Sequence, residues 1–101
     1  GGPQVAVAGS VRNQAIYELK NGNGVHATVG DALQLAGGLS STASVLRASL
    51  ERINAHKDRS VADISLQGAG RETLLKEGDI LRVLPISPEV RKTVTLRGNV
   101  A

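Results

Sequence analysis

Two histidines and a few basic side chains are the residues of this chain that could do chemistry or bind a ligand. His26 and His56 lie 30 residues apart, which matches no common metal-ligand spacing. The acidic residues are scattered, so no carboxylate pair on one element can act as general acid and base. The absence of cysteine excludes a thiol nucleophile, a disulfide framework and a Cys-ligated zinc site. We therefore predict no catalytic residues, no metal site and no cofactor, and expect that the protein is not an enzyme.

The ligand-binding residues stay open, with Tyr17, Arg47 and Arg52 as the candidates. Tyr17 is the only aromatic residue, so the chain has no platform on which sugars, bases or flavins could stack. We expect Tyr17 to be a packing residue whose hydroxyl finds a hydrogen-bond partner. Polar side chains could still line a water-filled conduit without binding sugar tightly.

The positive charge is small and dispersed. Twelve Lys and Arg residues against nine Asp and Glu residues give a net charge of +3. Acidic residues interrupt the densest basic stretch, which contains Arg47, Glu51, Arg52, Lys57, Asp58 and Arg59. Nucleic-acid footprints are usually more basic and more concentrated. We predict a solvated mixed-charge face with His56 near its tip, and no nucleic-acid partner.

The composition is that of one small domain with an aliphatic core. The chain has 101 residues, 41% hydrophobic and 21% charged, and its core must consist of Val, Leu, Ile and Ala. It contains no signal peptide and no run of 18 apolar residues. We expect no membrane contact by this segment itself.

One short amphipathic helix, Thr28 to Leu39, is the element that the other segments must surround. Thr28 and Asp31 form the pattern of a capping box. Four apolar residues then recur at helical spacing, Val29, Ala32, Leu33 and Ala36. Gly37 or Gly38 can take the left-handed conformation that ends a helix. A Gly-Gly pair after a helix does not form a phosphate cradle, which requires glycines before the helix.

The remaining segments are predicted to be strands and turns. Gln4 to Val11, with a bend or bulge at Gly9, and Ala15 to Leu19 form a hairpin, and Asn21 to Gly24 is a turn. Ala48 to Ile53 is a third strand, and the fourth alternates through Ser60, Ala62, Ile64 and Leu66 with one buried face. Gln67 to Gly70 is a loop. Ile80 to Ile86 is a central strand covered on both faces, with Pro85 at its end.

The end of the chain repeats its beginning. Val94 to Val100 matches Val5 to Val11 as Val-x-(Val/Leu)-x-Gly-(Ser/Asn)-Val, at an offset of 89 residues. We interpret this as the first strand of a second repeat, so that residues 4–86 form one domain, 87–92 a linker and 93–101 a truncated repeat. We predict that the apolar segment 93–100 pairs with an edge of its own module or with a neighbouring chain.

Four motifs together resemble the SLBB domain, the soluble-ligand-binding β-grasp. They are the Gly-(Ser/Asn)-Val strand end, Ile16-Tyr17-Glu18-Leu19, Thr28 to Leu39, and Leu75-Lys76-Glu77-Gly78-Asp79-Ile80-Leu81-Arg82-Val83. The family's Asn-Pro-Gly-x-Tyr turn is only partly kept, because Arg12 to Tyr17 lacks its Pro and Gly. The resemblance covers about residues 5 to 86. It implies an α+β fold of the β-grasp (ubiquitin-like roll) type, with a mixed sheet of about five strands packed on one short helix.

Tandem copies of this domain are typical of outer-membrane polysaccharide export (Wza-like) proteins. The resemblance therefore implies a periplasmic structural or oligomerisation module that helps to form the wall of a conduit for capsular polysaccharide or exopolysaccharide. Its implied partners are other copies in a ring, neighbouring SLBB repeats and the polysaccharide in transit. The alternative is a module that binds a protein or a small ligand such as a sugar or cobalamin.

Overall fold

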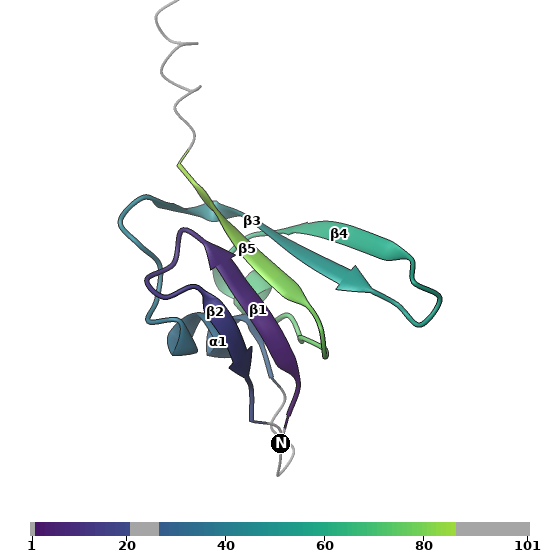
Figure 1. Cartoon of the computed structure of the whole chain (residues 1–101). Coiled ribbons are helices and arrows are strands. Elements are labelled where there is room, and N and C mark those ends of the chain that lie inside the picture. The colour runs from purple at the N-terminus through teal and green to yellow at the C-terminus, as the bar shows by residue number, and fades with distance from the viewer. Residues whose placement is uncertain (1, 21–26, 87–101) are drawn as a thin grey trace, which may run out of the picture.

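Five strands and two short helices form the part of the chain that the structure, a computed structural model, describes: residues 2–20 and 27–86. The strands are β1 (Gln4–Gly9), β2 (Ala15–Glu18), β3 (Ala43–Ile53), β4 (Arg59–Ile64) and β5 (Ile80–Pro85). The α-helix α1 spans Val29–Leu35, and the 3-10 helix η1 spans Gly68–Glu72, where the sequence predicted a loop (Figure 1).

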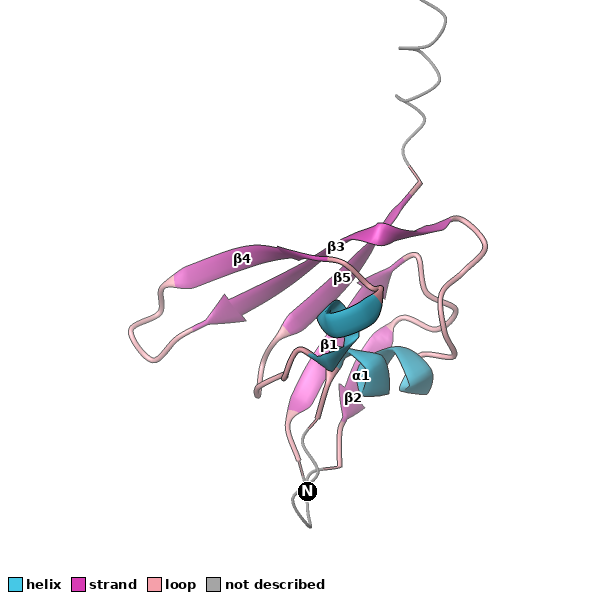
Figure 2. Cartoon of the chain, turned by 180° about the vertical axis from the view of Figure 1, so that it is seen from behind, coloured by secondary structure: helices cyan, strands magenta, loops and turns pink. Residues whose placement is uncertain are grey.

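The strands form one mixed sheet in the order β2-β1-β5-β3-β4. The central pair β1 and β5 is parallel, and all other neighbours are antiparallel. Both helices lie on the same face of the sheet (Figure 2). The predicted α+β fold is confirmed: a mixed five-stranded sheet packs on one α-helix, in an arrangement compatible with a β-grasp.

Helix α1 has the start and stop that its sequence predicted, although its regular part is shorter than Thr28 to Leu39. The Asp31 N–H donates to Thr28 Oγ1 at 3.2 Å, and the Thr28 N–H donates to Asp31 Oδ2 at 3.1 Å, which completes the capping box. At the other end, Gly37 has φ of 83° and Gly38 donates its N–H to the Leu33 carbonyl at 2.9 Å. This is a Schellman ending, which places the helix end at Ala36.

The core lies between the helix and the sheet. Its fully buried apolar side chains come from every layer, and the largest are Val5, Val7, Leu19, Val29, Leu33, Leu66, Leu81 and Val83. Asp79 is the one charged side chain buried as completely among the described residues. The four residues of the predicted helical stripe are all buried. Strand β1 ends at Gly9, where a Cβ would lie 2.1 Å from the Val83 carbonyl oxygen, so a side chain there would force β1 and β5 apart.

Two predictions of burial were wrong. Strand β4 has no continuous buried face: Ser60 and Ala62 are exposed, and only Ile64 reaches the core, followed by Leu66 beyond the strand. Strand β5 is central, but it is buried on one face only, because Leu81 and Val83 face α1 while Arg82 is exposed. The cause is the same in both cases, since one short helix covers one face of part of the sheet.

Other boundaries differ by a few residues. Strand β3 begins at Ala43, five residues before the predicted start at Ala48, and β1 ends before Val11, which forms an isolated bridge with Leu39. The predicted turn at Asn21 to Gly24, His26, the linker 87–92 and the repeat strand 93–101 lie outside the described residues. The domain division and the pairing of segment 93–100 therefore stay predictions.

Candidate functional site

Arg52 is bound to a buried aspartate. Its Nε donates to Asp79 Oδ1 at 2.9 Å and its Nη2 donates to Asp79 Oδ2 at 2.7 Å, a two-point pairing of guanidinium and carboxylate. Asp79 is only 1% exposed, and it also accepts the Lys76 N–H at 2.8 Å. Arg52 Nη2 donates further to the Leu74 carbonyl at 3.1 Å. The end of β3 is thereby joined to the loop that leads into β5.

The pairing with Asp79 stabilises the charged form of Arg52. The hydrogen bond to Asp79 raises the pKa of Arg52 above its ordinary value, as does the aspartate's charge, while partial burial opposes the shift. Sequence reasoning placed Asp79 in the last of the four SLBB motifs and missed this role. The signal was a Gly-Asp pair immediately before a buried strand, but its partner is 27 residues away.

Tyr17 packs against the core from the inner face of the sheet. It lies opposite Val5 in the β1–β2 register and is partly buried. Its hydroxyl donates to the Asn13 carbonyl oxygen. Both the ring and the hydroxyl of Tyr17 therefore have contacts within the domain.

Arg47 and His56 lie apart from Arg52. Arg47 lies five positions before Arg52 along β3, which corresponds to about 16 Å between Cα atoms in an extended strand. Arg47 is exposed and lines a small hollow of about 200 Å³ with Leu46, Ala48, Asp63 and Leu84. His56 is exposed in the loop between β3 and β4. The three ligand-binding candidates thus do not come together in one site.

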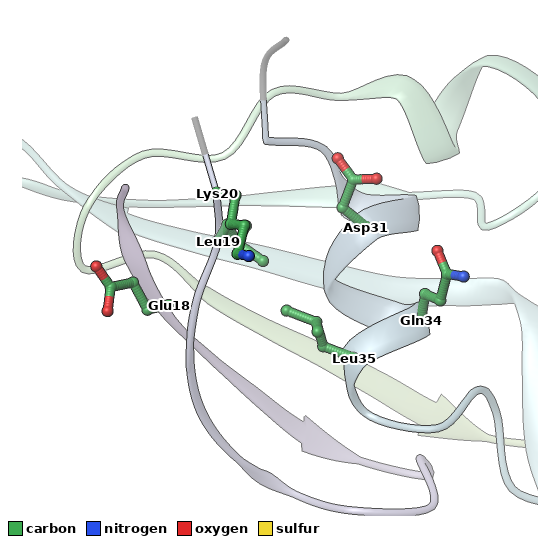
Figure 3. A pocket seen from close by; sticks show the side chains of 6 residues that line it. All are labelled: Glu18, Leu19, Lys20, Asp31, Gln34 and Leu35. Atoms are coloured by element: carbon green, nitrogen blue, oxygen red, sulfur yellow. The ribbon is translucent and has the colours of Figure 1, made fainter. Parts of the chain in front are cut away.

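A larger hollow of about 290 Å³ lies between the end of β2 and α1 (Figure 3). It is lined by Glu18, Leu19, Lys20, Asp31, Gln34 and Leu35. Leu35 is 49% exposed and points from α1 toward the segment that carries Leu19 and Lys20. Asp31 is already used by the capping box. The hollow therefore offers an apolar wall with Glu18, Lys20 and Gln34 as its further polar residues.

The face of the sheet away from α1 carries a mixture of apolar and charged side chains. One row crosses all five strands through neighbouring positions, from Ile16 through Ala6, Ile80 and Glu51 to Val61. Its two ends are well exposed, Ile16 by 71% and Val61 by 56%. Near its middle, Glu51 forms ion pairs with Arg59 at 3.6 Å and Arg82 at 3.8 Å. Such a surface suits contact with protein or with water better than tight binding of one small ligand.

Within residues 2–20 and 27–86, no group of three or more His, Cys, Asp or Glu side chains could hold a metal ion. No helix in that part of the chain is long and apolar enough to cross a membrane.

The model of the SLBB domain family matches residues 4–64, which is more than half of the chain. Among curated proteins, no significant match was found.

Proposed function

The chain belongs to the SLBB domain family, and from that premise we propose that it is a structural and oligomer-forming module of a protein that exports capsular polysaccharide or exopolysaccharide. The observation that carries the proposal is the family match, because SLBB domains occur in polysaccharide export proteins. In this role the module lies in the periplasm, as part of an outer-membrane-associated protein, and helps to form the wall of the conduit.

The surface chemistry supports a wall more than a tight receptor. The only aromatic side chain, Tyr17, is partly buried and hydrogen-bonded. The guanidinium of Arg52 is held by Asp79. Wide surfaces of charged and small polar groups stay hydrated, and a polymer can slide along them because it is not held by stacking contacts. The partners in this role are other copies of the protein, neighbouring SLBB repeats and the polysaccharide in transit.

The parent gene provides the test. Deleting the codons for residues 4–86 should abolish polysaccharide at the cell surface while the rest of the protein still reaches the outer membrane. The parent should also encode a polysaccharide-export domain upstream and a lipoprotein signal. Normal export by the deletion protein, or the lack of both upstream elements, would contradict the proposal.

Two point variants test whether the module acts as part of a conduit wall or as a receptor for a ligand. Tyr17→Phe and Arg47→Ala remove polar groups of candidate ligand-binding residues without emptying the core. Export should be unchanged in both if the module acts as a wall. Loss of export with a normal amount of folded protein would instead favour ligand binding.

The alternative function is a binding module for a small ligand, and the hollow between β2 and α1 favours it. Its volume of about 290 Å³ is at the lower end for ligand pockets. Titration of labelled protein with oligosaccharides and with cobalamin, followed by NMR, tests this directly. Shifts centred on Lys20, Gln34 and Leu35 that disappear in Gln34→Ala would support the alternative, and no shifts at millimolar ligand would exclude it.

A further inference from the structure

Strand β4 is an edge of the sheet, and nothing among residues 2–20 and 27–86 pairs with its outer side. Five of its six residues are exposed, from Arg59 to Asp63. The β3–β4 hairpin extends beyond the helices, so they do not shield this edge (Figure 1). An exposed edge strand of this kind is a template on which another strand can pair.

The backbone groups that point outward can be assigned from the ladder. Asn54 donates its N–H to the Asp58 carbonyl at 3.0 Å, so this pair, which closes the hairpin, is a hydrogen-bonded one. Hydrogen-bonded and non-hydrogen-bonded pairs alternate along an antiparallel ladder. The register therefore directs the backbone N–H and C=O groups of Ser60, Ala62 and Ile64 toward β3. The N–H and C=O groups of Arg59, Val61 and Asp63 are directed toward the free edge.

These same three residues share one face of the sheet, because they alternate along the strand. Their order is a cation, an aliphatic residue and an anion, and that order is self-complementary when the strand is reversed. Asp63 forms no ion pair within the described part of the chain, and Arg59 has only the 3.6 Å contact with Glu51. The edge thus presents one unpaired carboxylate and one loosely held guanidinium.

We propose that the β4 edge is a self-association surface, on which two copies of this chain pair antiparallel about a two-fold axis at Val61. In this register Val61 lies opposite Val61 of the second copy. Arg59 of each copy lies opposite Asp63 of the other. All three outward residues of each strand are then hydrogen-bonded, and both ion pairs form. The two sheets join into one continuous sheet.

Other antiparallel registers are poorer. A two-fold axis at Arg59 or at Asp63 places like charges opposite each other, which is destabilising. An axis at Ser60 pairs Arg59 with Val61 and leaves the outward groups of Asp63 facing a loop residue, Lys57. The register centred on Val61 is therefore the one that the charges select.

The interface goes beyond the proposed function, because a two-fold contact closes on two copies and therefore adds to, and does not replace, the contacts that would build a ring. One pair of short strands gives a small interface, which belongs to the weak and transient class. We expect a dimer that forms between micromolar and millimolar concentration and that strengthens when several modules are joined in one assembly.

Charge reversal in the full chain tests the register. Sedimentation velocity over a concentration series should show dimers of the unaltered protein. Arg59→Asp alone and Asp63→Arg alone should each associate roughly tenfold more weakly or worse, because two ion pairs become like-charge pairs. An equimolar mixture of the two variants should form a heterodimer, and Arg59→Asp/Asp63→Arg in one chain should restore the homodimer.

Two further variants test the backbone pairing. Val61→Pro removes an N–H that faces the free edge and is not used in the β3–β4 ladder, so it should prevent association. Val61→Thr keeps that N–H and the branched shape, and should still associate. Glu72→Arg, a charge reversal on η1, should have no effect.

The proposal is overturned if the unaltered chain is monomeric at millimolar concentration. It is also overturned if both single reversals associate as well as the unaltered chain, which would indicate another surface such as segment 93–100. Neither result bears on the deletion test for export, so the failure of this interface and the failure of the proposed function can be told apart.

Discussion

The strands beneath α1 and the far part of the β3–β4 hairpin are built from similar aliphatic residues, yet they bury them very differently. Beneath the helix, Val5, Val7, Leu81 and Val83 have almost no exposed surface. In the part of the hairpin that we call the distal hairpin, residues 52–62, Ile53 is 57% exposed and Val61 is 56% exposed. Residue type therefore does not decide burial here, whereas the reach of one seven-residue helix does.

The two regions are consequently held by different interactions. The region beneath α1 is stabilised by apolar surface removed from water. A two-stranded hairpin is marginal by itself, and the distal hairpin has its ladder, the loop from Asn54 to Asp58 and the pairing of Arg52 with Asp79. Substitutions in the two regions should therefore differ in the kind of interaction that they remove. They should also differ in how much they lower the free energy of unfolding.

The largest effect should come from the helix side of the core. Leu33→Ala removes a fully buried side chain and should lower the free energy of unfolding by about 2–5 kcal/mol. Leu35→Ala is the matched control on the same helix, because Leu35 is half exposed, and should cost under about 1 kcal/mol. Urea unfolding followed by circular dichroism measures both. Equal losses would mean that burial by α1 does not distinguish the two positions.

The next effect should come from the attachment of the hairpin. Arg52→Ala leaves the buried Asp79 carboxylate with the Lys76 N–H as its one remaining donor among the described contacts. Breaking a buried ion pair in this way should cost about 3 kcal/mol, the lower end of the usual range, since the Arg52 side chain is 32% exposed.

Arg47→Ala is the control for Arg52→Ala, because it removes an exposed arginine from the same strand. It should change the free energy of unfolding by under about 0.5 kcal/mol. Hydrogen exchange should also show faster exchange of the β3–β4 amides in Arg52→Ala. A loss as small as that of Arg47→Ala would show that the Asp79 pairing does not hold the hairpin.

The same contrast explains what the sequence could predict. The helix start and stop are local, since Thr28 and Asp31 are three residues apart and Gly37 follows the last turn directly. The capping hydrogen bonds and the glycine stop do not depend on distant parts of the chain, so the start and the end of the helix were both predicted. The β1–β2 hairpin and the central place of β5 were predicted for a similar reason, from short runs bounded by turns.

The distal hairpin and the Arg52–Asp79 pair depend on tertiary distance. Alternation along β4 shows which residues share a face, but it does not show how far the helix extends over that face. Nothing in the sequence indicated that Arg52 is paired, because its partner Asp79 is 27 residues away in the chain. The ligand-binding roles of Tyr17, Arg47 and Arg52 stay predictions, which the point variants above address.

A smaller effect tests the local signals of the helix. Thr28→Ala removes the acceptor for the Asp31 N–H and should lower the free energy of unfolding by about 1 kcal/mol. Thr28→Ser keeps the hydroxyl, and because Ser is at least as good an N-cap as Thr, it should leave the free energy of unfolding nearly unchanged. Thermal unfolding of both variants measures the difference. If Thr28→Ser were as unstable as Thr28→Ala, the methyl group rather than the cap would account for the loss.

The smallest effect should come from the open face of the sheet, where Glu51 links the two regions. Glu51 contacts Arg82 on β5 and Arg59 on the distal hairpin at 3.8 and 3.6 Å, and the two arginine side chains are 47% and 65% exposed. Glu51→Gln keeps the shape but removes the charge, and should cost under about 1 kcal/mol because solvent screens such pairs. Half-molar sodium chloride should abolish the difference, since surface ion pairs are screened by salt, whereas it should leave the loss in Leu33→Ala intact. A larger or salt-independent loss would mean that the open face contributes to the fold as the core does, and the contrast between the two regions would then fail.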